Sequence, residues 1–189
     1  MSASLFDRFL STAPMVEAFA DEALLQGMLD FEAALVRAQA AEGVIPASAA
    51  APITAACRAA GLDPKALVSA GSLAGTLVVP LVKALTARVA AADPPAAGWV
   101  HWGTTSQDVL DTAMVLSTRR AVALLDASMA TLLRGLDAQA RAHDEAPMLG
   151  RTLLQPAPVI SVGVKLLSWF APLVRARERL RTAAVAALR

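Results

Sequence analysis

Apolar residues recur at helical spacing along most of the chain, and the runs are separated by glycine and proline. The first run predicts one helix over residues 14–42, because Pro14 suits a first turn and Gly43 stops the pattern. Its apolar stripe consists of Leu24, Met28, Phe31, Leu35 and Ala38. A second, shorter helix is predicted from Pro46 to Ala60, and Asp63 is the predicted N-cap of a third.

The segment from Gly71 to Ala92 begins with small residues and then becomes apolar and helical, with Pro80 either kinking the helix or marking its true start. The sequence Asp-Pro-Pro-Ala-Ala-Gly at 93–98 is the clearest break in the chain. It predicts a boundary between a small N-terminal helical domain, residues 1–95, and a second domain, residues 96–189.

Two long helices are predicted for that second domain. The first extends from Ser106 to His143 and carries a heptad-like stripe made of Val115, Val122, Leu125, Met129, Leu132 and Leu136. A stripe of this length indicates the first part of an extended helical bundle. After Ala146-Pro147, residues 150–158 are expected to form an irregular, proline-rich connector. The second long helix starts near Val159 and reaches Arg189 without a stop signal, so we expect a chain cut inside a helix.

Composition strengthens the helical prediction. Apolar residues make up 56% of the 189 residues and alanine, the best helix former, dominates them. Aromatic residues are only 4% and tyrosine is absent, which argues against an antiparallel β fold. The predicted fold class is therefore all-α.

Charge and cysteine usage exclude several classes of partner. The 17 basic and 16 acidic residues give a net charge of +1, with no basic run dense enough to predict nucleic-acid binding. The single cysteine, Cys57, permits no internal disulfide, which fits a reducing, cytoplasmic setting. The longest apolar stretch, 153–173, contains Lys165 and three prolines, so we interpret it as a core element and expect no membrane partner.

A polar cluster interrupts this apolar sequence where the first long helix begins. It consists of His101, Trp102, Gly103, Thr104, Thr105, Ser106, Gln107 and Asp108. A helix start offers unpaired N–H groups and the positive end of the helix dipole, so it can hold a small carboxylate. Thr104 with Gln107, or Thr105 with Asp108, has the spacing of a capping box. A cap needs only one or two such residues, so the pattern favours a binding site over capping alone.

A second polar cluster lies in the connector between the two long helices. Arg151 can pair with a carboxylate, while Thr152 and Gln155 can offer a hydroxyl and an amide. A plain connector explains these residues equally well. His143 is expected to be a solvated residue near a helix end, and two distant histidines predict no metal site. The sequence contains no phosphate loop, dinucleotide fingerprint or serine-hydrolase elbow.

Taken together, in order and spacing, residues 101–113 and 150–158 resemble the first two signature regions of the fumarase/aspartase superfamily. The resemblance covers essentially the whole chain. It is strongest to a branch of cycloisomerases that act in protocatechuate breakdown, on the opening residues 4–9, the segment 71–89 and the variant second region.

The resemblance implies homotetramers around a central bundle of long helices, with each active site assembled from three subunits. It implies a small tricarboxylate substrate, carboxymuconate, and no cofactor or metal. One substrate carboxylate adds to a double bond, the adjacent carbon takes a proton, and a carboxymuconolactone results.

Site residues follow from the resemblance position by position. It implies that Thr105 and Ser106 contact a substrate carboxylate, flanked by Thr104 and His101. Gln107 is a further candidate substrate contact. The implied contacts of the second region are Thr152 and Gln155, beside which Arg151 remains a candidate substrate contact from its charge. The candidate catalytic residues are His101 and Ser106. Such groups would stabilise the enolate-like aci-carboxylate formed during the reaction.

The chain departs from the superfamily pattern in two places. Many lyases carry a proton-transferring histidine where this chain has Leu153, which counts against lyase chemistry of that kind. The third signature, a Gly-Ser-Ser-x-Met-Pro loop with the expected catalytic serine, is absent, so the general acid stays unassigned. Two alternatives remain open: a superfamily lyase resembling adenylosuccinate lyase, and a helical assembly fragment without activity of its own.

Overall fold

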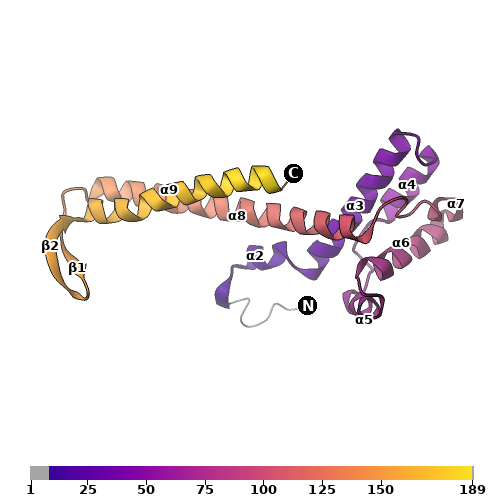
Figure 1. Ribbon diagram of the computed structural model, residues 1–189, viewed down its shortest axis with the longest axis horizontal. Helices are drawn as coiled ribbons and strands as arrows, with labels where there is room; N and C mark the ends of the chain where they lie inside the picture. The colour runs from indigo at the N-terminus through magenta and orange to yellow at the C-terminus, as the bar shows by residue number, and fades with distance from the viewer. Residues whose placement is uncertain (1–8, 189) are drawn as a thin grey trace. The chain divides into compact units, whose positions relative to one another are not determined.

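The computed structural model describes residues 9–188 and is predominantly helical (Figure 1). Its elements in chain order are α2 (Ala13–Ala18), α3 (Asp21–Ala41), α4 (Ala47–Ala56), α5 (Pro64–Ala74), α6 (Val78–Ala92), α7 (Pro94–Ala97), α8 (Ser106–Ala142), β1 (Pro147–Thr152), β2 (Gln155–Ser161) and α9 (Val162–Ala187). Two compact units divide at Thr118 and Arg119, within α8. The predicted all-α fold is confirmed, with one small hairpin added.

The core of the first unit lies among α3, α4, α5, α6, α7 and the start of α8. From α6 it takes Val78, Leu81, Leu85 and Val89, which are all at most 2% exposed and recur every three or four residues. Such spacing places them on one helix face. Cys57 is also in this core, and burial raises the pKa of its thiol to about 12, so Cys57 is a neutral packing residue.

The predicted single helix over 14–42 is wrong at its beginning. Helix α2 ends at Ala18, Ala20 has an extended backbone with ψ 153°, and α3 starts at Asp21. The first turn of α3 contains two acidic residues, Asp21 and Glu22, whose negative charges interact favourably with the positive end of the helix dipole. Periodicity continues through this break because the apolar residues on both sides keep helical spacing.

The buried face of α3 also differs from the predicted stripe. The residues buried on α3 are Leu25, Gly27, Met28, Leu29, Glu32, Ala33 and Val36, whereas Ala38 of the predicted stripe is exposed. The buried face is thus turned by about one position. It contains a glutamate, which apolar periodicity cannot select.

Two of the predicted helix starts are confirmed. The Asp63 side chain accepts a hydrogen bond from the Lys65 N–H at 2.9 Å and caps α5. Pro80 lies in the first turn of α6, where a missing N–H costs nothing, so it marks the start of the helix. The break at 93–98 is itself a helical turn, α7, capped by Asp93 at 3.1 Å from the Ala96 N–H.

Arg88 on α6 hydrogen-bonds to the end of α4 and to the segment that follows it. Its guanidinium donates to the carbonyl oxygens of Ala56, Arg58 and Ala60 at 3.0, 2.6 and 3.2 Å. Ala56 ends α4 and also accepts from the Arg58 N–H at 2.8 Å, while Arg58 and Ala60 lie beyond the helix. The planar fork of one arginine therefore reaches three acceptors at once. The segment is thereby tied to the core that positions α3.

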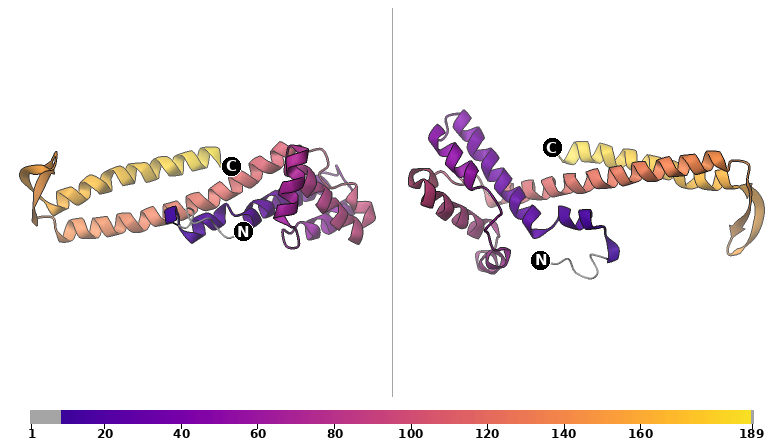
Figure 2. Two further views of the ribbon diagram at one scale, coloured as in Figure 1. Left: turned by 90° about the horizontal axis from the view of Figure 1, so that it is seen from below. Right: turned by 180° about the vertical axis from the view of Figure 1, so that it is seen from behind.

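In the second unit, α9 runs back beside the second half of α8 (Figures 1 and 2). Arg177 on α9 donates Nε and Nη2 to the two carboxylate oxygens of Asp126 on α8, at 2.7 and 2.9 Å. This bidentate hydrogen bonding holds the pKa of Asp126 below its usual value. The predicted stripe on α8 is only partly covered by described residues, since Leu125 is 45% and Leu132 is 49% exposed.

The predicted irregular connector is wrong: residues 147–161 form an antiparallel hairpin. Thr152 pairs with Gln155 across a two-residue turn made of Leu153 and Leu154, whose φ angles are 45° and 63°. Turns with two positive φ angles fit the twist of a hairpin but normally use asparagine and glycine. A Cβ on Gly150 would lie 2.6 Å from the Pro158 oxygen, so glycine is required at the irregularity in β1.

The entry into α9 brings two backbones into direct contact. A Cβ on Gly163 would lie 2.6 Å from the Asp144 Cα and 3.1 Å from the Ala140 oxygen. The Gly163 N–H donates to the His143 oxygen at 3.0 Å, so the end of α8 and the start of α9 are hydrogen-bonded at the same place. Only glycine permits this approach.

Across residues 9–188, no helix is both long enough and apolar enough to cross a membrane. The same residues contain no group of three or more histidine, cysteine, aspartate or glutamate side chains arranged to hold a metal ion.

Candidate active site

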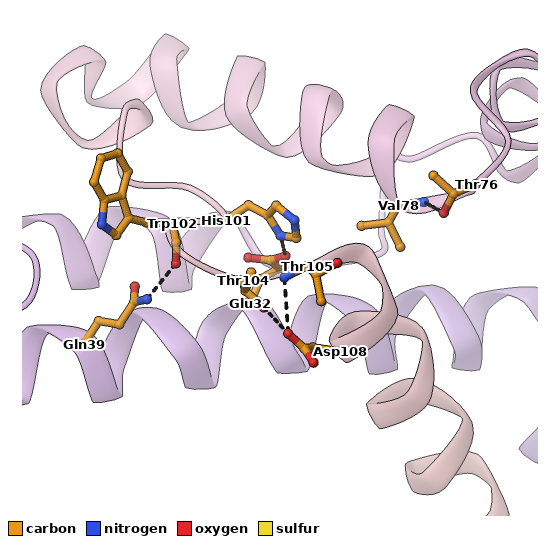
Figure 3. A network of polar contacts seen from close by, with 9 residues as sticks. All are labelled: Glu32, Gln39, Thr76, Val78, His101, Trp102, Thr104, Thr105 and Asp108. Atoms are coloured by element: carbon orange, nitrogen blue, oxygen red, sulfur yellow. Dashed lines mark hydrogen bonds and ion pairs between the residues drawn. The ribbon is translucent and has the colours of Figure 1, made fainter.

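The loop that leads into α8 is held against α3 by its backbone (Figure 3). The Gln39 side chain on α3 donates to the Trp102 carbonyl oxygen at 2.7 Å, and the Trp99 and Trp102 rings pack edge to face with centroids 5.0 Å apart. His101 and Gly103 both have positive φ, 59° and 66°. A left-handed histidine costs conformational energy, so the surrounding contacts must keep the loop in this form.

His101 is turned toward α3, where its ring meets a buried carboxylate (Figure 3). Its Nδ1 lies 2.6 Å from Oε1 of Glu32, whose side chain is 2% exposed, while that of His101 is 19% exposed. Desolvation raises the pKa of Glu32, and the hydrogen bond from His101 partly offsets this rise. A buried carboxylate without a hydrogen-bond partner would be strongly destabilising, and the imidazole of His101 supplies that partner.

The first turn of α8 is capped by Asp108. One carboxylate oxygen, Oδ2, accepts from the Thr105 N–H at 3.2 Å and from the Thr104 hydroxyl at 3.0 Å. Thr105 directly precedes the helix and Asp108 is its third residue, so the carboxylate reaches back as in a capping box. The capping interpretation is therefore right for Thr105 with Asp108, while the alternative partner Gln107 donates to Asp111 at 2.7 Å.

Capping accounts for only some of the polar atoms at this helix start. Within residues 9–188, the side-chain hydroxyls of Thr105 and Ser106 have no hydrogen-bond partner, and Thr105 is exposed. Both lie where the positive end of the α8 dipole faces outward. Together with the N–H groups of the first turn, they can donate to a ligand carboxylate, which is the chemistry predicted for this cluster.

The second cluster lies on the hairpin of the second unit. Arg151, Thr152 and Gln155 flank its turn and are all exposed, with Thr152 and Gln155 opposite each other in the register. Arg151 also borders an open hollow of about 730 Å³ on the hairpin, whose other cationic residue is Lys165 of α9. Leu153, at the position occupied by histidine in many lyases, is 92% exposed at the tip of the turn.

Glu32 is the residue that the sequence analysis missed. The spacing of the sequence does contain a signal for it: Glu32 follows Leu25, Met28 and Leu29 at helical spacing, on the buried face of α3. A carboxylate on such a face requires a partner.

His143 is exposed beside the end of α8, as predicted.

Comparison with known proteins places these features in a family. The sequence profile of a family described as Lyase matches residues 8–188. A 3-carboxy-cis,cis-muconate cycloisomerase from Pseudomonas aeruginosa is 51% identical over 94% of this chain and 39% of its own length. A nitrosuccinate lyase from Streptomyces davaonensis is 47% identical over 92% of this chain and 36% of its own.

A crystal structure agrees with the sequence relatives. The 3-carboxy-cis,cis-muconate lactonizing enzyme from Pseudomonas putida superposes with a TM-score of 0.92 at 45% identity, covering 95% of this chain and 41% of that enzyme. The chain thus spans about 40% of the length of the relatives it matches. Since the family profile covers almost every residue, the chain belongs to this lyase family, within the fumarase/aspartase superfamily.

Proposed function

We propose that the protein carrying this chain is a cycloisomerase that closes 3-carboxy-cis,cis-muconate to a carboxymuconolactone in the breakdown of protocatechuate. The observation that carries the proposal is the 51% identity to the Pseudomonas aeruginosa cycloisomerase across 94% of the chain. Leu153 supports it, because a leucine cannot transfer protons as the histidine of many lyases does.

In the proposed reaction, the start of α8 binds a substrate carboxylate. The hydroxyls of Thr105 and Ser106 donate to it, Thr104 and Gln107 flank it, and His101 lies at the edge of the loop. When another carboxylate of the substrate adds to the double bond, negative charge develops on the bound one, which becomes an aci-carboxylate. Donors placed beforehand lower the energy of that charge, and the adjacent carbon then takes a proton.

Arg151, Thr152 and Gln155 of the hairpin are proposed to contact the substrate in a composite site. The basis is the family pattern, in which different subunits contribute different signature regions. On this view the protein is a cytoplasmic homotetramer that needs no cofactor, and the chain by itself supplies only part of each site.

A second function has specific support. The nitrosuccinate lyase relative is 47% identical over 92% of the chain, so elimination from a smaller dicarboxylate is the alternative to lactone formation. Both reactions generate an anion next to a carboxylate, and the start of α8 suits either one. The two functions differ in substrate and in whether a group is expelled.

A graft separates these functions. In it, this chain replaces the aligned 177 residues of the Pseudomonas aeruginosa cycloisomerase, and turnover is followed by the loss of ultraviolet absorbance of 3-carboxy-cis,cis-muconate. We expect turnover within about tenfold of the parent enzyme, since a factor of ten corresponds to 1.4 kcal/mol. The chain alone is expected to give none. A folded graft that cleaves nitrosuccinate or adenylosuccinate and leaves the muconate untouched would make the protein a lyase.

A further inference from the structure

The contact between His101 and Glu32 joins two segments far apart in the sequence. Glu32 lies in the middle of α3 at 2% exposure, and His101 lies in the loop before α8, at 19% side-chain exposure. Burying a carboxylate costs free energy, and the attraction within a buried pair often does not offset that cost. Stabilisation of the fold is therefore a poor explanation for this contact. The loop also keeps His101 at a φ of 59°, which is a second energetic cost associated with this contact.

The chemistry of the two groups assigns the shared proton to one of them. Oε1 of Glu32 lies 2.6 Å from Nδ1 of His101, and an ionised carboxylate can only accept, so with Glu32 ionised Nδ1 is the donor. In a neutral ring the proton on Nδ1 leaves Nε2 unprotonated, with a free lone pair. A histidine side chain in water prefers the opposite arrangement, so we attribute the tautomer of His101 to Glu32.

The second nitrogen is not occupied by the protein. Figure 3 shows the ring with Nδ1 toward Glu32 and its other nitrogen turned away from that carboxylate. No described residue hydrogen-bonds to Nε2. His101 precedes Thr105 by four residues in the same loop, so this nitrogen belongs to the cluster proposed to receive the substrate.

We infer that Glu32 is a positioning residue, which holds the His101 ring with its proton on Nδ1 and presents Nε2 to the ligand at the start of α8. This inference rests on the proposed function for the part played by Nε2, while the orientation and tautomer stand on the contact itself. In that position Nε2 accepts a proton or a hydrogen bond from the bound acid, and Glu32 stabilises the cationic ring that follows.

The tautomer can be read directly because the chain has only two histidines. With the chain labelled with 15N-histidine, long-range proton–nitrogen correlation at mildly alkaline pH should show His101 protonated at Nδ1. Exposed His143 should show the Nε2-protonated form and serves as the internal reference. If His101 in the unsubstituted chain gives the same pattern as His143, the inference is wrong.

Substitution then tests the cause. Glu32→Met keeps the length and helix propensity of the side chain but removes the acceptor, so His101 should change to the pattern of His143. Glu22→Met, on the exposed surface of the same helix, should leave His101 unchanged. A His101 pattern that Glu32→Met does not alter would overturn the inference, and so would a change of equal size in Glu22→Met.

Kinetics of the graft separate positioning from a structural role. Glu32→Met should lower kcat by at least about tenfold and change KM by less than about threefold, because the carboxylate contacts remain while the ring loses its orientation. An unchanged kcat per folded molecule would show that Glu32 serves packing alone. If the unsubstituted graft is folded but inactive, the proposed function fails, and the tautomer measurement still decides the role of Glu32.

Discussion

Replacing Thr105 and Ser106 together with alanine is expected to lower the turnover of the graft by about 100- to 1,000-fold, while its melting temperature falls by only a few degrees. A single donor to a developing oxyanion is typically worth a factor of that size. Both hydroxyls lack partners among the described residues, so their removal should cost the folded chain little.

The small stability cost has a structural reason. Thr105 precedes the first turn of α8, and removing a capping side chain typically costs about 1 kcal/mol. Here the Asp108 carboxylate still accepts from the Thr105 N–H, which alanine retains at that position. The double variant should therefore lose the ligand donors and keep the reciprocal half of the cap.

A matched control lies further along the same helix. Ser128→Ala with Thr131→Ala removes one serine and one threonine hydroxyl from exposed positions of α8, and should leave turnover within about twofold. Turnover is measured per folded molecule, with the melting temperature read by circular dichroism. If the Thr105 and Ser106 variant melts far lower but turns over normally, both residues are caps and nothing more.

Gly163→Ala is expected to destabilise the chain by about 3 kcal/mol. The new Cβ would lie 2.6 Å from the Asp144 Cα and 3.1 Å from the Ala140 oxygen. Because these atoms are backbone, the clash can be relieved only by moving α9 away from the end of α8. The hydrogen bond from the Gly163 N–H to the His143 oxygen would be lost in that movement.

Gly135→Ala, on α8, is expected to have the opposite effect on stability. A Cβ there meets no atom within 4 Å, so alanine should stabilise α8 by about 1 kcal/mol through its higher helix propensity. Urea unfolding of the two variants and the unsubstituted chain measures both changes. Equal stability of Gly163→Ala and the unsubstituted chain would mean that α9 does not approach α8 as closely as the structure has it.

Much of the helical architecture could be predicted from local signals. The long helix predicted from Ser106 to His143 extends in the structure from Ser106 to Ala142, and Asp63 caps the helix that it was predicted to cap. These elements depend on residues close together in the chain. The same holds for Thr105 and Asp108, whose capping contact spans three residues.

The features that could not be predicted depend on distant contacts or on conflicting local signals. The hairpin contains Pro156 and Pro158, which argue against strands, and its turn consists of two leucines, which do not predict a turn. Its strands can tolerate proline because both are edge strands of a two-stranded sheet. Glu32 and His101 are 69 residues apart, and only the packing of the loop on α3 brings them together.

If the start of α8 serves a lactone-forming reaction, the product formed in heavy water should reveal it. The graft should convert 3-carboxy-cis,cis-muconate in D2O into a lactone of unchanged composition, except for a single deuteron taken up at the carbon next to the bound carboxylate. Mass spectrometry and proton NMR of the product measure both features. A product that has lost carbon dioxide or another group, or a folded graft that forms no lactone, would show that the start of α8 does not serve lactone formation.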